Sequence, residues 1–116
     1  MTAIKTSSTN QINKRVIVTK CPVTFTLHMI GGRWKPLIIN CLLTGTKRYG
    51  EIRKAIPAIS EKMLIQNLKE LEADDLLIRN AKPVVPPHVE YRLSECGEEL
   101  RPVLLSMKKW ALKHNI

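Results

Sequence analysis

The feature that most constrains the fold is a two-faced helical segment that begins near Ser60. At about 100° per residue, its apolar positions fall on one narrow stripe: Leu64, Leu68 and Leu71. Its polar positions fall on the opposite side: Lys62, Gln66 and Lys69. The Ser60 hydroxyl can accept from free amides of the first turn, and Glu61 sits where the helix dipole favours negative charge. One face therefore needs a core, and the other faces water or a polyanion.

A shorter helix is predicted just before this segment. Its residues are Lys47, Arg48, Tyr49, Ile52 and Ile56. Pro57 ends it, because proline cannot continue a helix. Three residues separate Pro57 from Glu61, and a turn this short is typical of two helices packed at a steep angle.

A proline-tipped hairpin is predicted after the two helices. Residues 77–82 and 89–93 are expected to be strands. The second strand alternates inward side chains with the outward Glu90 and Arg92: Val89, Tyr91 and Leu93 point inward. Between the strands stand Pro83, Pro86 and Pro87, which suit a hairpin tip because proline lacks a ladder donor. The order predicts a winged helix-turn-helix of the α+β class, mainly α. A plain structural hairpin is the alternative interpretation.

Two further helices are predicted upstream. Pro22 suits the first position of a helix that carries Val23, Leu27 and Ile30 on one spacing. Two glycines are expected to stop it as left-handed caps: Gly31 and Gly32. A second helix is expected from Trp34, with Pro36 in its first turn and Gly45 beyond its end. Its predicted buried side consists of Leu37, Ile38, Cys41 and Leu42.

One long final helix is predicted from Ser94 onward. Acidic residues in its first turns and lysines in its last turns match the helix dipole, and Pro102 should kink it. Its apolar stripe is larger than the chain's own core can cover: Leu100, Val103, Leu104, Met107, Trp110 and Ala111. Extra N- and C-terminal helices are therefore predicted to form a homodimer. The predicted dimer interface is Val23, Leu27, Leu104, Met107, Trp110 and Ala111.

Charge is unevenly distributed along the 116 residues. The net charge is +9, and residues 1–50 hold 8 Lys or Arg and no Asp or Glu. The length fits one domain. We expect residues 1–20 to form a basic N-terminal arm and residues 21–116 to form the DNA-binding and dimerisation domain. An asymmetry of this sign favours a polyanionic partner, although ribosome-associated and membrane-surface proteins share it.

Several classes of protein are disfavoured by what the sequence lacks. No apolar run approaches the ~18 residues that span a bilayer, and no signal-peptide core stands at the start, so a cytoplasmic location without membrane contact is expected. The three cysteines form no metal-ligand pattern. No acidic or cysteine partner stands at a catalytic or metal-binding spacing from His28, His88 or His114. Neither enzyme activity nor a metal or other cofactor is therefore expected.

Five stretches resemble one known family: Cys21–Val23, Ile30–Lys35, Arg48–Ile52, Ile59–Asp74 and Pro86–Tyr91. Together they look like the HxlR-type winged-helix transcriptional regulators, over residues 21 to about 112. The resemblance implies a homodimer that binds operator DNA as repressor or activator. The chain departs from the family in having His88 for an arginine, Asp75 for a glycine, and Ile65 at a position that is often polar.

The predicted DNA contacts combine the two-faced helix with the hairpin. The full set is Arg48, Ser60, Lys62, Ile65, Gln66, Lys69, Lys82 and His88. Lysine can reach guanine acceptors, glutamine can pair with adenine, and Ile65 can touch a thymine methyl group. Arg48 and Lys82 are assigned to phosphate contacts, which form equally with every base sequence. A symmetric dimer would place two such helices about 34 Å apart on a near-palindromic operator.

Cys21 is the candidate regulatory residue. It precedes a predicted helix, where amide dipoles lower the pKa of a thiol. Some members of the resembled family use a cysteine at this place to sense oxidants or electrophiles, whereas the alternative is a thiol without function. Cys41 is expected in the core, and Cys96 has no assigned role unless it lies near Cys21 of a partner subunit. Trp34 is expected in the core, with a small effector pocket beside it left open.

Two other functions fit the same pattern. The winged helix could serve as a protein-interaction module without operator binding. RNA binding is a second alternative, although stacking residues are scarce: the chain holds two Trp, two Tyr and one Phe.

Overall fold

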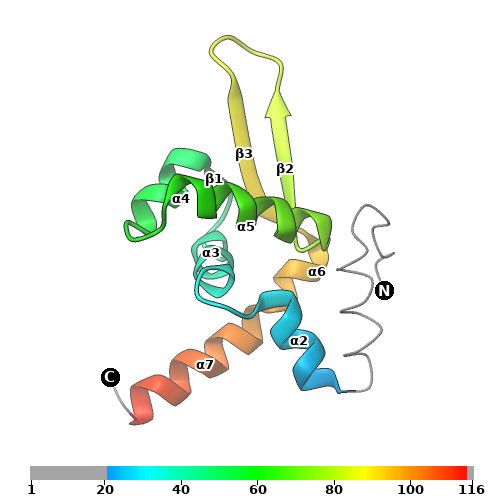
Figure 1. Cartoon of the computed structure of the whole chain (residues 1–116), viewed down its shortest axis with the longest axis vertical. Coiled ribbons are helices and arrows are strands. Elements are labelled where there is room, and N and C mark those ends of the chain that lie inside the picture. The colour runs from blue at the N-terminus through cyan, green and yellow to red at the C-terminus, as the bar shows by residue number, and fades with distance from the viewer. Residues whose placement is uncertain (1–20, 115–116) are drawn as a thin grey trace.

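The computed structural model describes residues 21–114, so the predicted basic arm of residues 1–20 lies outside the described residues. Figure 1 shows a helical body from which a two-stranded hairpin projects. In chain order the elements are α2 (Pro22–Ile30), α3 (Lys35–Leu42), β1 (Lys47–Arg48), α4 (Tyr49–Ala55), α5 (Glu61–Ala73), β2 (Leu77–Lys82), β3 (His88–Leu93), α6 (Glu95–Glu98) and α7 (Arg101–His114). This arrangement is the predicted winged helix-turn-helix, mainly α with a small sheet.

The sheet has three antiparallel strands in the order β1-β3-β2. The hairpin register runs from Leu77 opposite Leu93 to Lys82 opposite His88. At the other edge Arg48 lies opposite Glu90. The base of the hairpin is buried and its tip is exposed, so the wing is anchored in the body and reaches into solvent.

One core joins the helices to the base of the sheet. Its buried apolar residues are Ile30, Ile38, Ile39, Leu42, Ile52, Ile56, Ile59, Leu64, Leu68, Leu71, Leu76, Leu77, Tyr91, Leu93 and Leu104. The whole predicted leucine stripe of α5 is in this set, which confirms the two-faced pattern. The inward positions Tyr91 and Leu93 are buried as the strand alternation predicted, and Val89 packs against the core.

The predicted buried face of α3 is partly wrong. Leu37 is 45% exposed and Cys41 only half-buried, whereas Ile39 is fully buried. The buried residues Ile38, Ile39 and Leu42 belong to the same core as Tyr91 and Leu93 of β3, which is a neighbour of α3. A short helix with apolar residues on most of its surface does not specify which arc is buried.

Lys47 and Arg48 do not belong to the helix predicted for them. They form β1, because Lys47 pairs with Tyr91 across the sheet. The helix α4 then begins at Tyr49, and the Glu51 carboxylate caps its start by accepting from the Arg48 backbone N–H at 2.8 Å. Ile56 lies just past its end and is still buried. A two-residue strand carries too little pattern to be predicted from sequence.

The predicted long final helix is two helices. Ser94 caps the first, as expected, by accepting from the Gly97 N–H at 2.9 Å. Instead of a kink, the chain breaks between Glu98 and Arg101. Pro102 has no N–H to donate to the carbonyl of Glu98, so the helical hydrogen-bond ladder is interrupted there. As a result α7 leaves the body at its own angle (Figure 1).

The double glycine after α2 stops that helix in two different ways. Gly32 adopts a left-handed φ of 90°, as predicted. Gly31 is extended instead, but a Cβ there would collide with the Leu27 carbonyl oxygen, to which its own N–H donates. Glycine is thus required at one position for its conformation and at the other for its size.

Candidate nucleic-acid interface

Helix α5 presents its polar face beside the wing. In Figure 1 it lies across the front of the molecule at the base of the β2–β3 hairpin. Its start is fixed by Ser60, whose hydroxyl accepts from the Met63 N–H at 3.1 Å. The predicted base-reading residues are all exposed: Lys62, Ile65, Gln66 and Lys69. Among residues 21–114, no carboxylate forms an ion pair with either of these lysines.

The Gln66 side chain is exposed, but its amide is already hydrogen-bonded within the protein. Its amide nitrogen donates to a Glu70 carboxylate oxygen at 3.1 Å. The other oxygen of Glu70 lies 2.7 Å from the Lys35 ammonium on α3. Glu70 therefore ties the reading face of α5 to the body and orients the Gln66 amide. Sequence reasoning missed this role, since the i,i+4 spacing of Gln66 and Glu70 was the only available signal.

The turn from α5 into the wing is fixed by a few hydrogen bonds. Asp75 adopts a left-handed φ of 58°, a conformation that suits glycine better. Its carbonyl accepts from the Ser94 hydroxyl at 2.6 Å, while the Ser94 N–H donates to the Leu76 carbonyl at 3.1 Å. The same serine caps α6. Ser94 thus locks the end of α5, the start of β2 and the end of β3 together, so that the Asp75 departure is accommodated.

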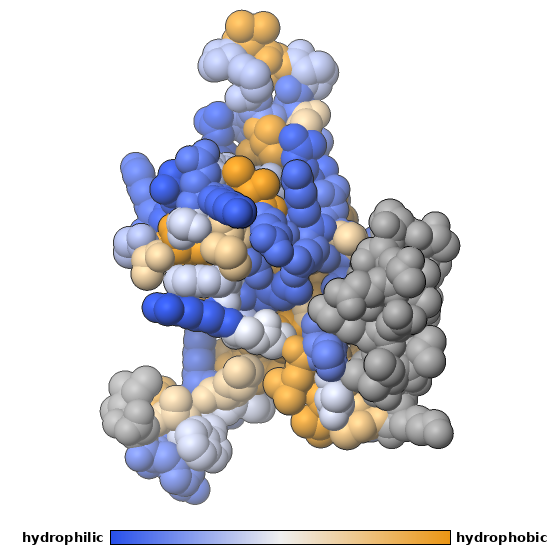
Figure 2. Space-filling model, viewed as in Figure 1, coloured by the Kyte–Doolittle hydropathy of each residue, from blue (hydrophilic) through white to orange (hydrophobic). Residues whose placement is uncertain are grey.

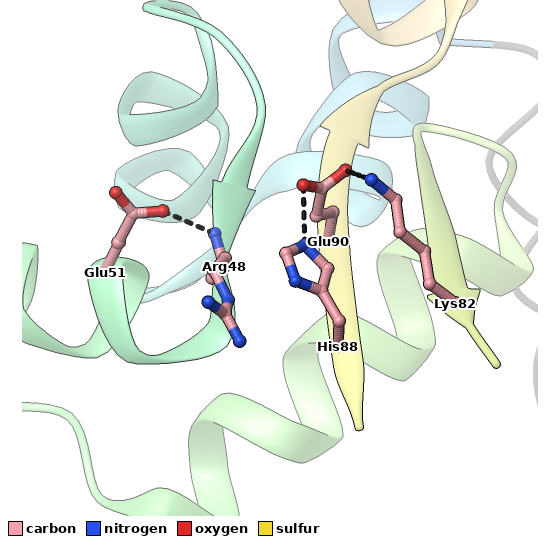
Figure 3. Close-up of polar contacts among 5 residues, drawn as sticks. All are labelled: Arg48, Glu51, Lys82, His88 and Glu90. Carbon is pink, nitrogen blue, oxygen red and sulfur yellow. Dashed lines mark hydrogen bonds and ion pairs between the residues drawn. The ribbon is translucent and has the colours of Figure 1, made fainter. Parts of the chain in front are cut away.

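The predicted phosphate-binding residues of the wing converge on Glu90. Figure 3 shows the side chains of Lys82 and His88 directed toward its carboxylate. A ring nitrogen of His88 lies 2.7 Å from one oxygen, and the Lys82 ammonium lies 3.6 Å from the other. The hydrogen bond from His88, aided by the charge of Lys82, holds the pKa of Glu90 below its usual value. Sequence reasoning placed Glu90 outward but gave it no role.

Arg48 lies beside this group on β1. Its backbone N–H is used by Glu51, and its side chain is exposed (Figure 3). Among residues 21–114, its guanidinium forms no ion pair. The wing tip beyond is apolar, with Val84 and Val85 exposed, as the top of Figure 2 shows. Lys82 and His88 close the strands just before this apolar tip, and Arg48 lies opposite Glu90 on the neighbouring strand.

Cys21 is exposed and directly precedes α2. Hydrogen bonds from the Thr24 side chain and backbone lower its pKa, in the direction predicted for a thiol at a helix start. Cys41 differs, because burial raises its pKa. Cys96 is exposed on α6 and, with Phe25 and Met29 of α2, lines a hollow of about 630 Å³.

The terminal helices expose apolar side chains. On α2, Val23 and Leu27 are mostly exposed, and Figure 2 shows apolar atoms gathered there. On α7, Met107 and Trp110 are exposed, while Ala111 is half-buried. Leu104 is only 4% exposed and belongs to the chain's own core. Leu104 therefore has almost no exposed surface that it could contribute to the predicted dimer interface.

Trp34 is half-buried against the core, and the Arg33 guanidinium lies over its ring at 4.6 Å. The two residues line a hollow of about 370 Å³ between α3 and the end of α4. That a small effector binds there stays a prediction.

Within residues 21–114, none of the helices combines the length and the apolar character that a membrane span needs.

These features define the class of the protein. A capped helix that shows lysines and an amide to solvent, a short helix packed before it, and a cation-bearing hairpin beside it are those of a winged helix-turn-helix transcriptional regulator. The model of the HxlR-like helix-turn-helix family matches residues 29–115. The chain belongs to this family.

Known proteins agree with this assignment. The uncharacterized HTH-type transcriptional regulator YybR of Bacillus subtilis is 47% identical over 90 residues, which cover 78% of this chain and 72% of YybR. The oxidized form of the redox regulator HypR matches with a TM-score of 0.78 and 44% identity, over 83% of this chain and 99% of that one. The reduced form of the transcriptional regulator YodB from B. subtilis matches with a TM-score of 0.71 and 41% identity, over 82% and 94%.

Proposed function

We propose that this regulator binds a near-palindromic operator as a homodimer and represses or activates transcription from a nearby promoter. The observation that carries the proposal is the reading face of α5. Lys62, Gln66 and Lys69 are exposed on one side of a helix whose other side is fully buried. Side chains of this kind can read base edges in a major groove, while the adjacent wing reaches the backbone.

The terminal helices support the homodimer. Four apolar side chains of α2 and α7 are each between 51% and 68% exposed, namely Val23, Leu27, Met107 and Trp110, and exposed apolar side chains gathered on neighbouring elements are typical of an interface. A two-fold axis through this surface would present two α5 helices to successive major grooves, about 34 Å apart. Leu104 is left out of this proposed interface because it is already buried.

We further propose that oxidation of Cys21 alters operator affinity. Three observations support this: the thiol is exposed, its pKa is lowered, and the similar structures include HypR, a redox regulator solved in oxidized and reduced forms, and diamide-treated YodB. A lower pKa raises the thiolate fraction that reacts with oxidants. A Cys21→Ser variant should keep its operator affinity in diamide while the wild type changes. Equal responses in both proteins would reject this proposal.

The experiment that tests the function is selection of duplexes from a random pool by the purified full-length chain. We expect one near-palindromic sequence to be enriched, with half-sites about one helical turn apart. Enrichment of no sequence, together with binding to a protein partner that is insensitive to salt, would favour the interaction module instead. Steep loss of affinity with rising salt is expected only for nucleic-acid binding.

A further inference from the structure

Glu90 is the single acidic residue in positions 76–94, a stretch that otherwise carries Arg79, Lys82 and Arg92. The function proposed above places this hairpin against a phosphate backbone. A carboxylate there repels phosphates. Its presence on the wing therefore calls for a structural reason.

The geometry supplies one. Glu90 lies on the central strand, with Arg48 opposite on β1 and Lys82 reaching it from β2. Each of its two oxygens has a different partner: His88 on the same strand and Lys82 on the neighbouring one. The Glu90 side chain is 26% exposed and that of Lys82 is 47% exposed, so both groups keep contact with solvent. Figure 3 shows both partner side chains reaching toward Glu90.

Both partners are residues assigned to DNA contacts. In the free protein the Lys82 ammonium and a ring nitrogen of His88 already lie against a carboxylate, so a phosphate has to compete for them. Ion pairs with this much solvent contact are weak. A duplex offers a row of phosphates and can displace the carboxylate when the wing docks.

We propose that Glu90 is a positioning residue of the wing, whose carboxylate holds Lys82 and His88 in the free protein and gives them up to a backbone phosphate on DNA binding. This inference rests on the proposed function. Phosphate contacts carry no base information. Glu90 therefore lowers affinity for every duplex by a similar factor and leaves base discrimination to α5.

Salt dependence distinguishes this exchange from plain binding. When Lys82 moves from Glu90 to a phosphate, the counterion released from DNA is offset by one taken up at the freed carboxylate. With Glu90→Gln no such offset exists. The slope of log affinity against log salt should then steepen by about 1 for each cation released.

The test compares Glu90→Gln with Glu98→Gln in the full-length chain. Glu98 forms an ion pair of 2.8 Å with Arg101 outside the wing, so the control loses the same charge and the same kind of contact. Glu90→Gln should raise affinity for operator and scrambled duplex alike, roughly 3- to 10-fold at low salt. Glu98→Gln should change neither the affinity nor the slope.

A third variant tests the contact itself. In a chain that carries Lys82→Ala and His88→Ala, adding Glu90→Gln should leave the slope unchanged and raise the affinity much less than it does in the wild-type background. A gain of the same size without Lys82 and His88 would show simple removal of repulsion and overturn the proposal. So would a Glu90→Gln protein that behaves like Glu98→Gln, or one that loses affinity with an unchanged melting curve.

Should Glu90→Gln fail to fold, NMR of the wild type gives the same answer. The His88 ring signals should shift when a duplex is added, because its bond to Glu90 is exchanged for a phosphate. Unchanged His88 signals at saturating duplex would overturn the inference while leaving DNA binding intact. A wild type that binds no duplex would instead overturn the proposed function.

Discussion

At the scale of single residues, the side chains proposed to read bases and those proposed to contact the DNA backbone lie on different elements. Gln66 and Lys69 stand on the exposed face of α5, and Glu70 orients the Gln66 amide at 3.1 Å. Arg48 lies at the sheet edge, close to Glu90 and the base of the wing. Residue type and helical spacing predicted the exposed face of α5, but Arg48 was expected on a helix and lies on β1. The roles of Glu70 and Glu90 were not predicted, because each carboxylate also pairs with a lysine from another element, Lys35 on α3 and Lys82 on β2.

Substitution of a proposed base-reading residue should change DNA affinity and base preference differently from substitution of a proposed phosphate-binding residue. Gln66→Ala and Lys69→Ala should each weaken operator binding by about 1–3 kcal/mol and relax base preference. Arg48→Ala should weaken operator and scrambled duplexes equally. Affinities for a panel of single-base operator variants check this. If Arg48→Ala and Gln66→Ala gave the same profile across the panel, the division of roles would be wrong.

The reactivity of Cys21 should depend on Thr24. The Thr24 hydrogen bonds favour the thiolate and lower its pKa, so Thr24→Val, which removes the hydroxyl, should raise it. The midpoint of iodoacetamide alkylation against pH, followed at the Cys21 peptide by mass spectrometry, should therefore lie higher in the variant. The Cys41 peptide is the internal control, since burial raises its pKa independently. A Cys21 midpoint that does not move would contradict the assignment.

At the scale of elements, a strong local sequence pattern was sufficient to predict an element correctly, and a weak pattern was not. The Ser60 cap and the leucine stripe predicted α5 correctly, because capping and periodicity are both encoded within the helix. The β1 strand was missed since its two residues are extended only through pairing with β3. The rotation of α3 toward Ile39 and the break before Pro102 likewise depend on neighbouring elements. The wing was predicted, but the convergence of its cations on Glu90 was not.

Truncating a side chain should have different effects on the two faces of α5. Leu68→Ala, in the core, should lower the free energy of unfolding by about 2–5 kcal/mol. Ile65→Ala, three residues earlier on the exposed face, should change it by no more than about 0.5 kcal/mol while weakening operator binding. Urea denaturation followed by circular dichroism measures both. Equal destabilisation would mean that Ile65 packs as a core residue.

At the scale of the whole molecule, the apolar surface on α2 and α7 is the feature that a single chain leaves unexplained. Leu27 is 61% exposed and Trp110 is 64% exposed. The sequence predicted a surplus of apolar surface, but it could not separate Leu104, which the body covers, from the residues that stay outside. That distinction depends on the angle at which α7 leaves the core.

Charging this surface should break the proposed dimer. Leu27→Glu places a carboxylate in the interface and should yield a folded monomer with much weaker operator binding. Leu37→Glu is the matched control, because Leu37 is an exposed apolar residue on α3, outside α2, α7 and the proposed DNA contacts. Sedimentation equilibrium gives the masses, and thermal melts confirm folding. A Leu27→Glu protein with the same mass as the wild type would place the dimer interface elsewhere.

The central claim is that paired α5 helices read a specific duplex. Its most direct test is the ratio of dissociation constants of the wild type for the selected operator and for a scrambled duplex of equal length, measured at physiological salt. We predict a preference of about 10³-fold or more, abolished by combining Gln66→Ala with Lys69→Ala. A ratio near one in the wild type would contradict the claim.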